Sequence, residues 1–188
     1  MFAKLAQLDA PIFTQAQREH FIALAKSGRD FLMKHCLMGE NDWRCTFLME
    51  ENGAHKYVDG CDTLDMSIYA DCFVVIGLGK YAEVTGDQQA YAFAKRLYDS
   101  ICARIESGVF NTLPYPLSSG YRAHGIPMIL SNVSKELHGA AAVICPEDCA
   151  ELLKRIDGFT QDILTHFTDE NHVIHEVITK ENTFFGDL

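Results

Sequence analysis

The chain has 188 residues, of which 48% are hydrophobic and 22% charged, and its formal net charge is −10. This length suffices for one domain with its own hydrophobic core. The acidic balance, with no cluster of more than two basic residues, argues against a nucleic acid or an anionic membrane surface as partner. The seven cysteines form no C-x-x-C pair, so we expect free thiols in a reducing cytoplasm rather than a zinc site or a redox pair.

Two helices and a hairpin are predicted first. Residues 1–7 resemble the end of a helix, and the chain breaks at Asp9-Ala-Pro. Thr14 is a suitable N-cap for a second helix, which carries apolar residues at helical spacing as far as Cys36. Apolar residues then alternate from Trp43 to Met49, and the following Asn-Gly pair predicts a two-residue hairpin turn.

The segment SIYADCFVVIGLGKYAEVTGD, residues 67–87, is almost uniformly apolar but contains Asp71. Its length would allow a membrane span, but Asp71, Lys80 and Glu83 and the lack of flanking positive charge argue against one. We therefore expect a helix that is buried on most sides in a protein without a membrane segment. Gly86 is its expected C-cap, and Asp87 the N-cap of the next helix.

The remaining elements continue a helical pattern. An amphipathic helix follows over residues 88–107, and residues 108–120 form a loop. Residues 121–137 predict another mostly buried helix, with Pro127 in its first turn. A last amphipathic helix starts at Pro146, and residues 172–179 predict a short strand.

Buried helices thus alternate with helices that are apolar on one side only. A double-layered helical barrel gives this pattern, because its inner helices are covered by outer ones that face water. A solenoid of helix pairs would give a similar pattern, but no fixed-period consensus is present.

Four segments together resemble one protein family. Tyr69-Ala-Asp-Cys-Phe with Tyr81-Ala and Thr85-Gly-Asp, and the segments DWRCTFLMEENG, RAHGIPMILSNVSKEL and ILTHFTDENHVIHEVI, are similar in order and spacing to the N-acylglucosamine 2-epimerase family, which is also known as renin-binding protein and includes cellobiose 2-epimerases. The resemblance implies an all-α fold: residues 1–188 would be a single partial domain, the central part of an (α/α)6 barrel of about twice this length, with a short β-hairpin and a short C-terminal strand.

The resemblance also implies what this segment lacks. Both histidines of the family's acid/base pair and the arginine that holds the sugar would lie outside the 188 residues. We therefore assign no catalytic residue, no metal ligand and no cofactor, and we expect the chain alone to be inactive. Epimerisation at C2 of a reducing sugar needs two groups that titrate near neutral pH, one on each face of the carbon. The eight histidines present form no such pair by their spacing.

Five residues are candidate sugar contacts. Tyr69 matches the family's pocket aromatic, although it could equally be a core tyrosine. Asp71 lies about 200° round the helix from Tyr69, so it is either a structural hydrogen-bonding group or a polar group at the cavity end. Met128 and Asn132 share one helix face, which the resemblance turns towards the cavity. Glu176 lies on the last strand, where a solvent-facing carboxylate is the favoured reading. His124 reads as a loop histidine that could face the barrel mouth.

The first functional hypothesis is a segment of a sugar 2-epimerase or aldose–ketose isomerase, whose parent interconverts N-acylglucosamine and N-acylmannosamine, or a related reducing sugar. The alternative is a non-catalytic helical binding or scaffold protein, and a helical array unrelated to sugars comes third. Because half a barrel exposes a wide apolar edge, we expect a homo-oligomer.

Overall fold

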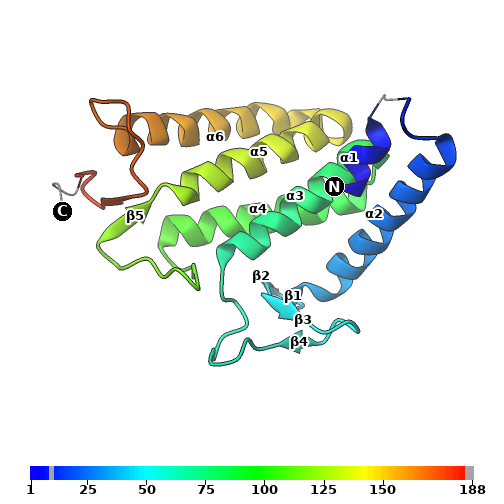
Figure 1. The fold of residues 1–188 in the computed structure, drawn as a ribbon, viewed down its shortest axis with the longest axis horizontal. Helices are drawn as coiled ribbons and strands as arrows, with labels where there is room; N and C mark the ends of the chain where they lie inside the picture. Colours follow the sequence, from blue (N-terminus) through cyan, green and yellow to red (C-terminus); the bar gives the residue numbers. More distant parts are fainter. Residues whose placement is uncertain (9–10, 185–188) are drawn as a thin grey trace.

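The computed structural model describes residues 1–8 and 11–184, and helices dominate it (Figure 1). The predicted chain break at Asp9-Ala falls outside these residues, although Pro11 next to it lies in a turn. The helices of the described ranges are α1 (Phe2–Gln7), α2 (Gln15–His35), α3 (Ile68–Thr85), α4 (Gln88–Ser107), α5 (Gly125–Ile144) and α6 (Cys149–Asp162).

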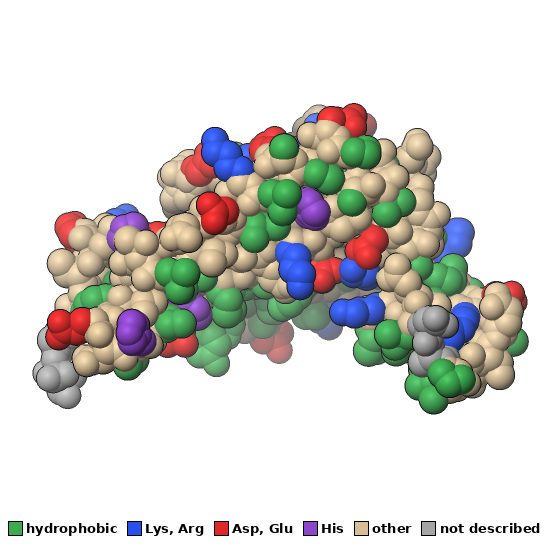
Figure 2. Space-filling model, turned by 90° about the horizontal axis from the view of Figure 1, so that it is seen from above, with side chains coloured by type: hydrophobic (Ala, Val, Ile, Leu, Met, Phe, Trp, Pro, Cys, Tyr) green, Lys and Arg blue, Asp and Glu red, His purple; other side chains and the backbone are tan. Residues whose placement is uncertain are grey.

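The helices form two layers. α3 packs against α1 on one side and α5 on the other, while α2, α4 and α6 each pack against the preceding member of this inner row. Figure 1 shows α4 passing behind α3, and Figure 2 shows an arched outline that is hollowed along its lower edge. This arrangement confirms the predicted fold class, a part of an α/α barrel.

The predicted helix ends agree with the structure. Thr14 makes a capping box with Gln17, in which each side chain bonds the other residue's backbone. Gly86 ends α3 in the left-handed conformation, with φ of 73°. Asp87 then accepts a hydrogen bond from the backbone N–H of Ala90 at the start of α4.

The hairpin prediction is partly wrong. The predicted strand from Trp43 to Met49 is broken into β2 (Asp42–Cys45) and β3 (Leu48–Met49), which belong to separate two-stranded sheets. β2 pairs with β1 (Leu37–Gly39), a strand that alternation did not indicate, and β3 pairs with β4 (His55–Lys56). The break follows from Thr46, whose backbone N–H bonds the carbonyl of Cys36 and whose hydroxyl bonds that of Leu48.

The turn between β3 and β4 also differs from the prediction. Glu50 and Ala54 are hydrogen-bonded, so the loop has three residues rather than two, and Gly53 closes it with φ of 85°. A three-residue loop that ends in a left-handed glycine is the next commonest hairpin connection.

Two further boundaries need correction. Residues 121–123 were expected to be helical, but they form β5 (Tyr121–Ala123), and α5 begins at Gly125 with Pro127 in its first turn. The last strand, β6 (Val177–Thr179), is shorter than predicted and pairs with β5 in antiparallel register. A 3-10 turn (Pro146–Asp148) precedes α6, and a π-helical turn (Ile163–Phe167) follows it. Pairing with β6 therefore takes the three residues of β5 out of the expected helix.

The core lies between the two layers. Its fully buried large side chains come from α3, α4, α5 and α6: Ile68, Val75, Leu78, Leu97, Tyr98, Ile101, Leu130, Val133, Leu137 and Leu152. α5 packs against α3 at Gly79, where an added Cβ would be in ordinary contact with the backbone of α5, 3.6 Å from the carbonyl oxygen of Glu136. Among the described helices, none has both the length and the apolar character that a bilayer crossing requires.

Candidate functional site

The inner helices leave one face uncovered. On α5, steps of four and three residues place Met128, Asn132 and Lys135 on the exposed side, while Ile129 and Val133 face the core. On α3 the same steps place Tyr69, Phe73, Gly77 and Lys80 along the side that the outer helices do not cover. We call this surface of α3 and α5 the inner face.

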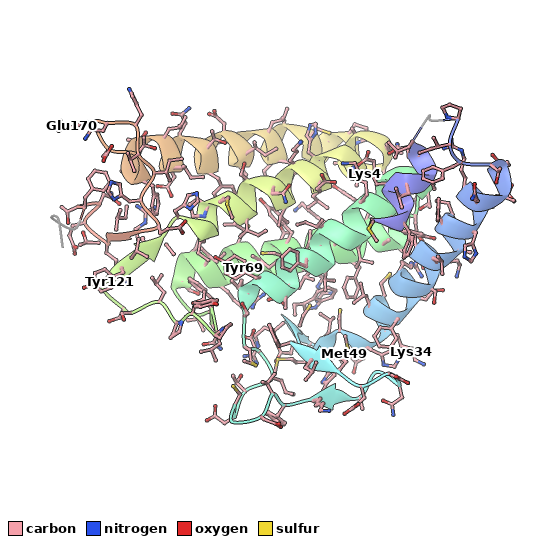
Figure 3. All side chains as sticks on the ribbon, viewed as in Figure 1. Lys4, Lys34, Met49, Tyr69, Tyr121 and Glu170 are labelled. Atoms are coloured by element: carbon pink, nitrogen blue, oxygen red, sulfur yellow. The ribbon has the colours of Figure 1, made fainter. Side chains whose placement is uncertain are left out.

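Tyr69 stands at the start of the inner face, on the first turn of α3 (Figure 3). Its hydroxyl lies close to Gly125, the first residue of α5. A Cβ added to Gly125 would be only 2.6 Å from the hydroxyl oxygen. Burial raises the pKa of Tyr69, and the neighbouring Cys72 and Glu176 contribute to this rise. Among the described residues, no hydrogen bond engages the Tyr69 hydroxyl, so it is available to a ligand.

Glu176 and His124 lie beside Tyr69. The backbone N–H of His124 donates to the carbonyl of Glu176, and this bond holds the chain before β6 against the start of α5. The His124 Nδ1 atom lies 3.8 Å from the Glu176 carboxylate. The imidazole is mostly buried, whereas the Glu176 side chain is 89% exposed, as expected for a solvent-facing carboxylate.

Met128 and Asn132 continue the inner face along α5. The backbone N–H of Met128 bonds the carbonyl of His124, so Met128 lies one turn further along the helix. Asn132 lies another turn on, about 12 Å from His124 along the helix axis. Both side chains are exposed, and no described residue bonds the Asn132 amide.

An ion pair crosses the inner face further along the helices. Lys80 of α3 lies 2.9 Å from the Glu136 carboxylate of α5 and also pairs with Glu83. Neither Lys80 nor the exposed ring of Phe73 was among the candidate residues. The four-residue step from Tyr69 to Phe73, and that from Asn132 to Glu136, would have indicated both sides of this surface.

Asp71 lies away from the inner face. Its carboxylate is fully buried, accepts a 2.6 Å hydrogen bond from the Cys45 N–H and forms a 2.7 Å ion pair with Arg104. These partners come from β2 and α4, so the contacts favour the structural reading of Asp71. Of the five candidate residues, Tyr69, Met128, Asn132 and Glu176 therefore remain as the candidate site, and His124 lies beside them.

Other reactive groups do not assemble into a site. All seven cysteines, which lie in the described ranges, are free thiols. Within residues 1–8 and 11–184, no cluster of three His, Cys, Asp or Glu side chains could hold a metal ion. His172 has φ of 62°, and His175 bonds Asp169, so these two histidines serve the loop before β6.

The chain is similar to known sugar epimerases. The chain is 22% identical over 172 residues to bovine N-acylglucosamine 2-epimerase, a match covering 90% of this chain and 38% of that protein. No family model matches the sequence.

Two solved structures share the fold. A sugar epimerase from a ruminal bacterium superposes with a TM-score of 0.70 and 14% identity, covering 99% of this chain and 46% of that one. Cellobiose 2-epimerase from Bacillus thermoamylovorans superposes with a TM-score of 0.54 and 18% identity, covering 81% and 40%. The resemblance to the N-acylglucosamine 2-epimerase family is thus confirmed, and the chain spans less than half the length of these relatives.

Proposed function

We propose that this chain forms part of the sugar-binding wall of a carbohydrate 2-epimerase. The parent protein would interconvert N-acylglucosamine and N-acylmannosamine, or a related reducing sugar, by removing a proton from C2 and returning one to the opposite face. The observation that carries the proposal is the inner face, where an aromatic ring, a free hydroxyl and a free amide lie on two adjacent helices.

These groups suit a sugar. An aromatic ring packs on the apolar C–H face of a pyranose, while a phenol hydroxyl and an amide bond its hydroxyl groups. Tyr69 and Asn132 supply this combination, and the exposed ring of Phe73 lies next to Tyr69 on α3. The Glu176 carboxylate adds an acceptor at the start of the site.

The proton transfers fall to groups that this chain does not supply. His124 lies at the start of the inner face, and a 2-epimerase needs a group on each side of C2. The proposal therefore includes that the 188-residue chain binds the sugar but does not turn it over. The free thiols fit a reducing compartment, and we place the parent in the cytoplasm.

Sugar binding to the chain tests this proposal. Saturation-transfer NMR with N-acetylmannosamine, N-acetylglucosamine, mannose and cellobiose should show binding of at least one. Tyr69→Phe and Asn132→Ala should each weaken it several-fold, since each removes one hydrogen-bonding group worth about 1 kcal/mol. Tyr115→Phe, on an exposed loop tyrosine, is the matched control and should have no effect.

A second measurement tests the catalytic part. The C2 proton of the bound sugar should persist in D2O, because no pair of acid and base flanks it. Epimer formation or C2 deuteration by the purified chain would contradict this, and binding that is insensitive to both Tyr69→Phe and Asn132→Ala would contradict the site.

A further inference from the structure

A cavity of about 420 Å³ lies on the other side of α5 from the inner face. It is enclosed by the C-terminal ends of α4 and α6, the 108–120 loop and the β5–β6 pair, at the end of the fold where Tyr121 is labelled in Figure 3. We call it the outer pocket. Most of its wall is apolar, and the apolar side chains include Ile105, Phe110, Ile126, Leu130, Phe159 and Phe167.

The outer pocket is separate from the proposed sugar site. Ile126 and Leu130 line it, and they point from α5 in the direction opposite to Met128 and Asn132. Phe167 stands between the two sites, because its buried ring contacts the His124 ring of the inner face at a centroid distance of 6.1 Å. A ligand of the pocket would therefore not occupy the sugar's place.

One positive charge on the wall is uncompensated. The Arg122 guanidinium forms two hydrogen bonds of 2.6 and 2.7 Å with the Asp162 carboxylate. It also lies over the Phe167 ring at 5.2 Å, so the Arg122 charge is already compensated within the protein. Lys180 is held at the pocket by a 3.0 Å bond from its backbone N–H to the Gly120 carbonyl. In the part of the chain that the structure describes, no carboxylate pairs with its ammonium group.

We propose that the outer pocket binds a small molecule with a flat apolar body and one anionic group, such as an aromatic carboxylate. The volume falls within the range of small-molecule sites, which are mostly apolar with a few polar groups that orient the ligand. The apolar wall takes the body of the ligand, and Lys180 takes its charge. In a chain with a net charge of −10, a local positive charge of this kind selects for an anion.

2-Naphthoate is a suitable probe, because it has a two-ring apolar body and one carboxylate and is fluorescent. Its binding to the 188-residue protein is titrated by fluorescence in wild type, Lys180→Glu and Lys135→Glu. Lys135→Glu is the matched control, because Lys135 is exposed on the inner face of α5 and the substitution makes the same change in net charge.

We expect saturable one-to-one binding to the wild type. Lys180→Glu should weaken it about tenfold, since it replaces an attraction with a repulsion of similar size, while Lys135→Glu should leave it within twofold. The neutral analogue 2-naphthalenemethanol should bind more weakly to the wild type and be insensitive to Lys180→Glu. Excess N-acetylmannosamine should not displace the probe.

Three results would overturn the proposal: no saturable binding to the wild type, equal weakening by both lysine variants, or weakening by Lys135→Glu alone. The second would assign the binding to net charge, and the third to the inner face. Failure of the sugar experiment leaves this test unaffected, because the two use different ligands and different residues.

Discussion

The carboxylate of Asp71 joins three elements of the fold. It lies on the first turn of α3, bonds the backbone of β2 at Cys45 and pairs with Arg104 near the end of α4. Arg104 has no other carboxylate within bonding distance in the described residues, and its Nη1 atom is buried without a partner. Removing Asp71 therefore leaves a largely buried guanidinium without a counter-charge.

We expect Asp71→Ala to lower the free energy of unfolding by about 3 kcal/mol, the lower end for a buried ion pair that loses one partner. Urea unfolding followed by circular dichroism measures the change. Asp99→Ala is the control, because Asp99 forms an exposed ion pair with Lys95 on the same helix as Arg104, and it should change stability by less than about 1 kcal/mol. Equal effects of the two variants would show that the Asp71 pair is not a buried one.

Asp65 gives a prediction about pH. Burial raises the pKa of Asp65 above its ordinary value of 3.8, and the nearby Asp71 adds to the rise, while Arg104 and Arg44 oppose it. A carboxyl group with a raised pKa binds its proton more tightly in the folded state, so its contribution to stability falls as the pH rises from about 4 through the folded-state pKa. The Asp65→Asn variant cannot lose this proton and should lack that component.

The stability difference between Asp65→Asn and wild type should therefore shift in favour of the variant between pH 4 and pH 7. Urea midpoints at several pH values measure it. Asp62→Asn, an exposed carboxylate in the same loop, should not show this trend. A difference that is constant with pH, or that moves towards the wild type, would contradict the raised pKa.

At the scale of single residues, the sequence predicted on which side of a helix a side chain lies better than it predicted the partner that the side chain bonds. The two-residue offset between Tyr69 and Asp71 placed them on different sides of α3, and the structure has them so. The identity of Arg104 as the partner of Asp71 was not predictable, since 33 residues separate them and only the packing of α4 on α3 brings them together.

Among the elements, the hairpin between β3 and β4 depends on the glycine that closes its loop. Gly53 has φ of 85°, a conformation that costs other residues about 1–2 kcal/mol. An added Cβ would also overlap the ring of His35 at the end of α2. Gly60 has φ of 81° in open space, so it carries the conformational requirement without the contact.

Gly53→Ala should therefore destabilise the protein by about 1–3 kcal/mol more than Gly60→Ala, because a buried overlap is added to the same backbone strain. Thermal unfolding of the two variants measures the difference. If both lower the melting temperature equally, the hairpin does not pack on α2 as the structure has it.

The periodicity and the caps in the sequence predicted the helices well, whereas the sequence predicted the paired strands poorly. Thr14, Gly86 and Asp87 act through bonds within a few residues of themselves, so their roles are visible in the sequence. β5 pairs with β6 across more than fifty residues. The sequence predicted a strand that contains β6, but its partner β5 was expected to be helical, because its three residues carry no alternation of their own. The outer pocket was not predictable for the same reason, since its wall combines residues 105–130 with residues 159–167 and Lys180.

For the whole molecule, the alternation of buried and amphipathic helices was enough to predict a double-layered helical barrel. It did not reveal that the inner face would be open along both α3 and α5. Phe73 is 62% exposed and Met128 48% exposed on that face, which is unusual for large apolar side chains of a buried helix row. Burying large apolar side chains such as these against another surface is favourable in free energy.

We therefore expect the 188-residue chain to self-associate through the inner face. Sedimentation over about a hundredfold range of concentration should give an average mass that rises above the 21.1 kDa of one chain. The double variant Phe73→Ser/Met128→Ser should shift the protein towards the monomer, because it removes the apolar surface without touching the core. Val109→Ser/Tyr115→Ser changes two apolar residues outside the inner helices that are more exposed than Phe73 and Met128, and it should leave association unchanged. A wild type that stays monomeric throughout, or equal loss of association in both variants, would show that the inner face is not the contact surface.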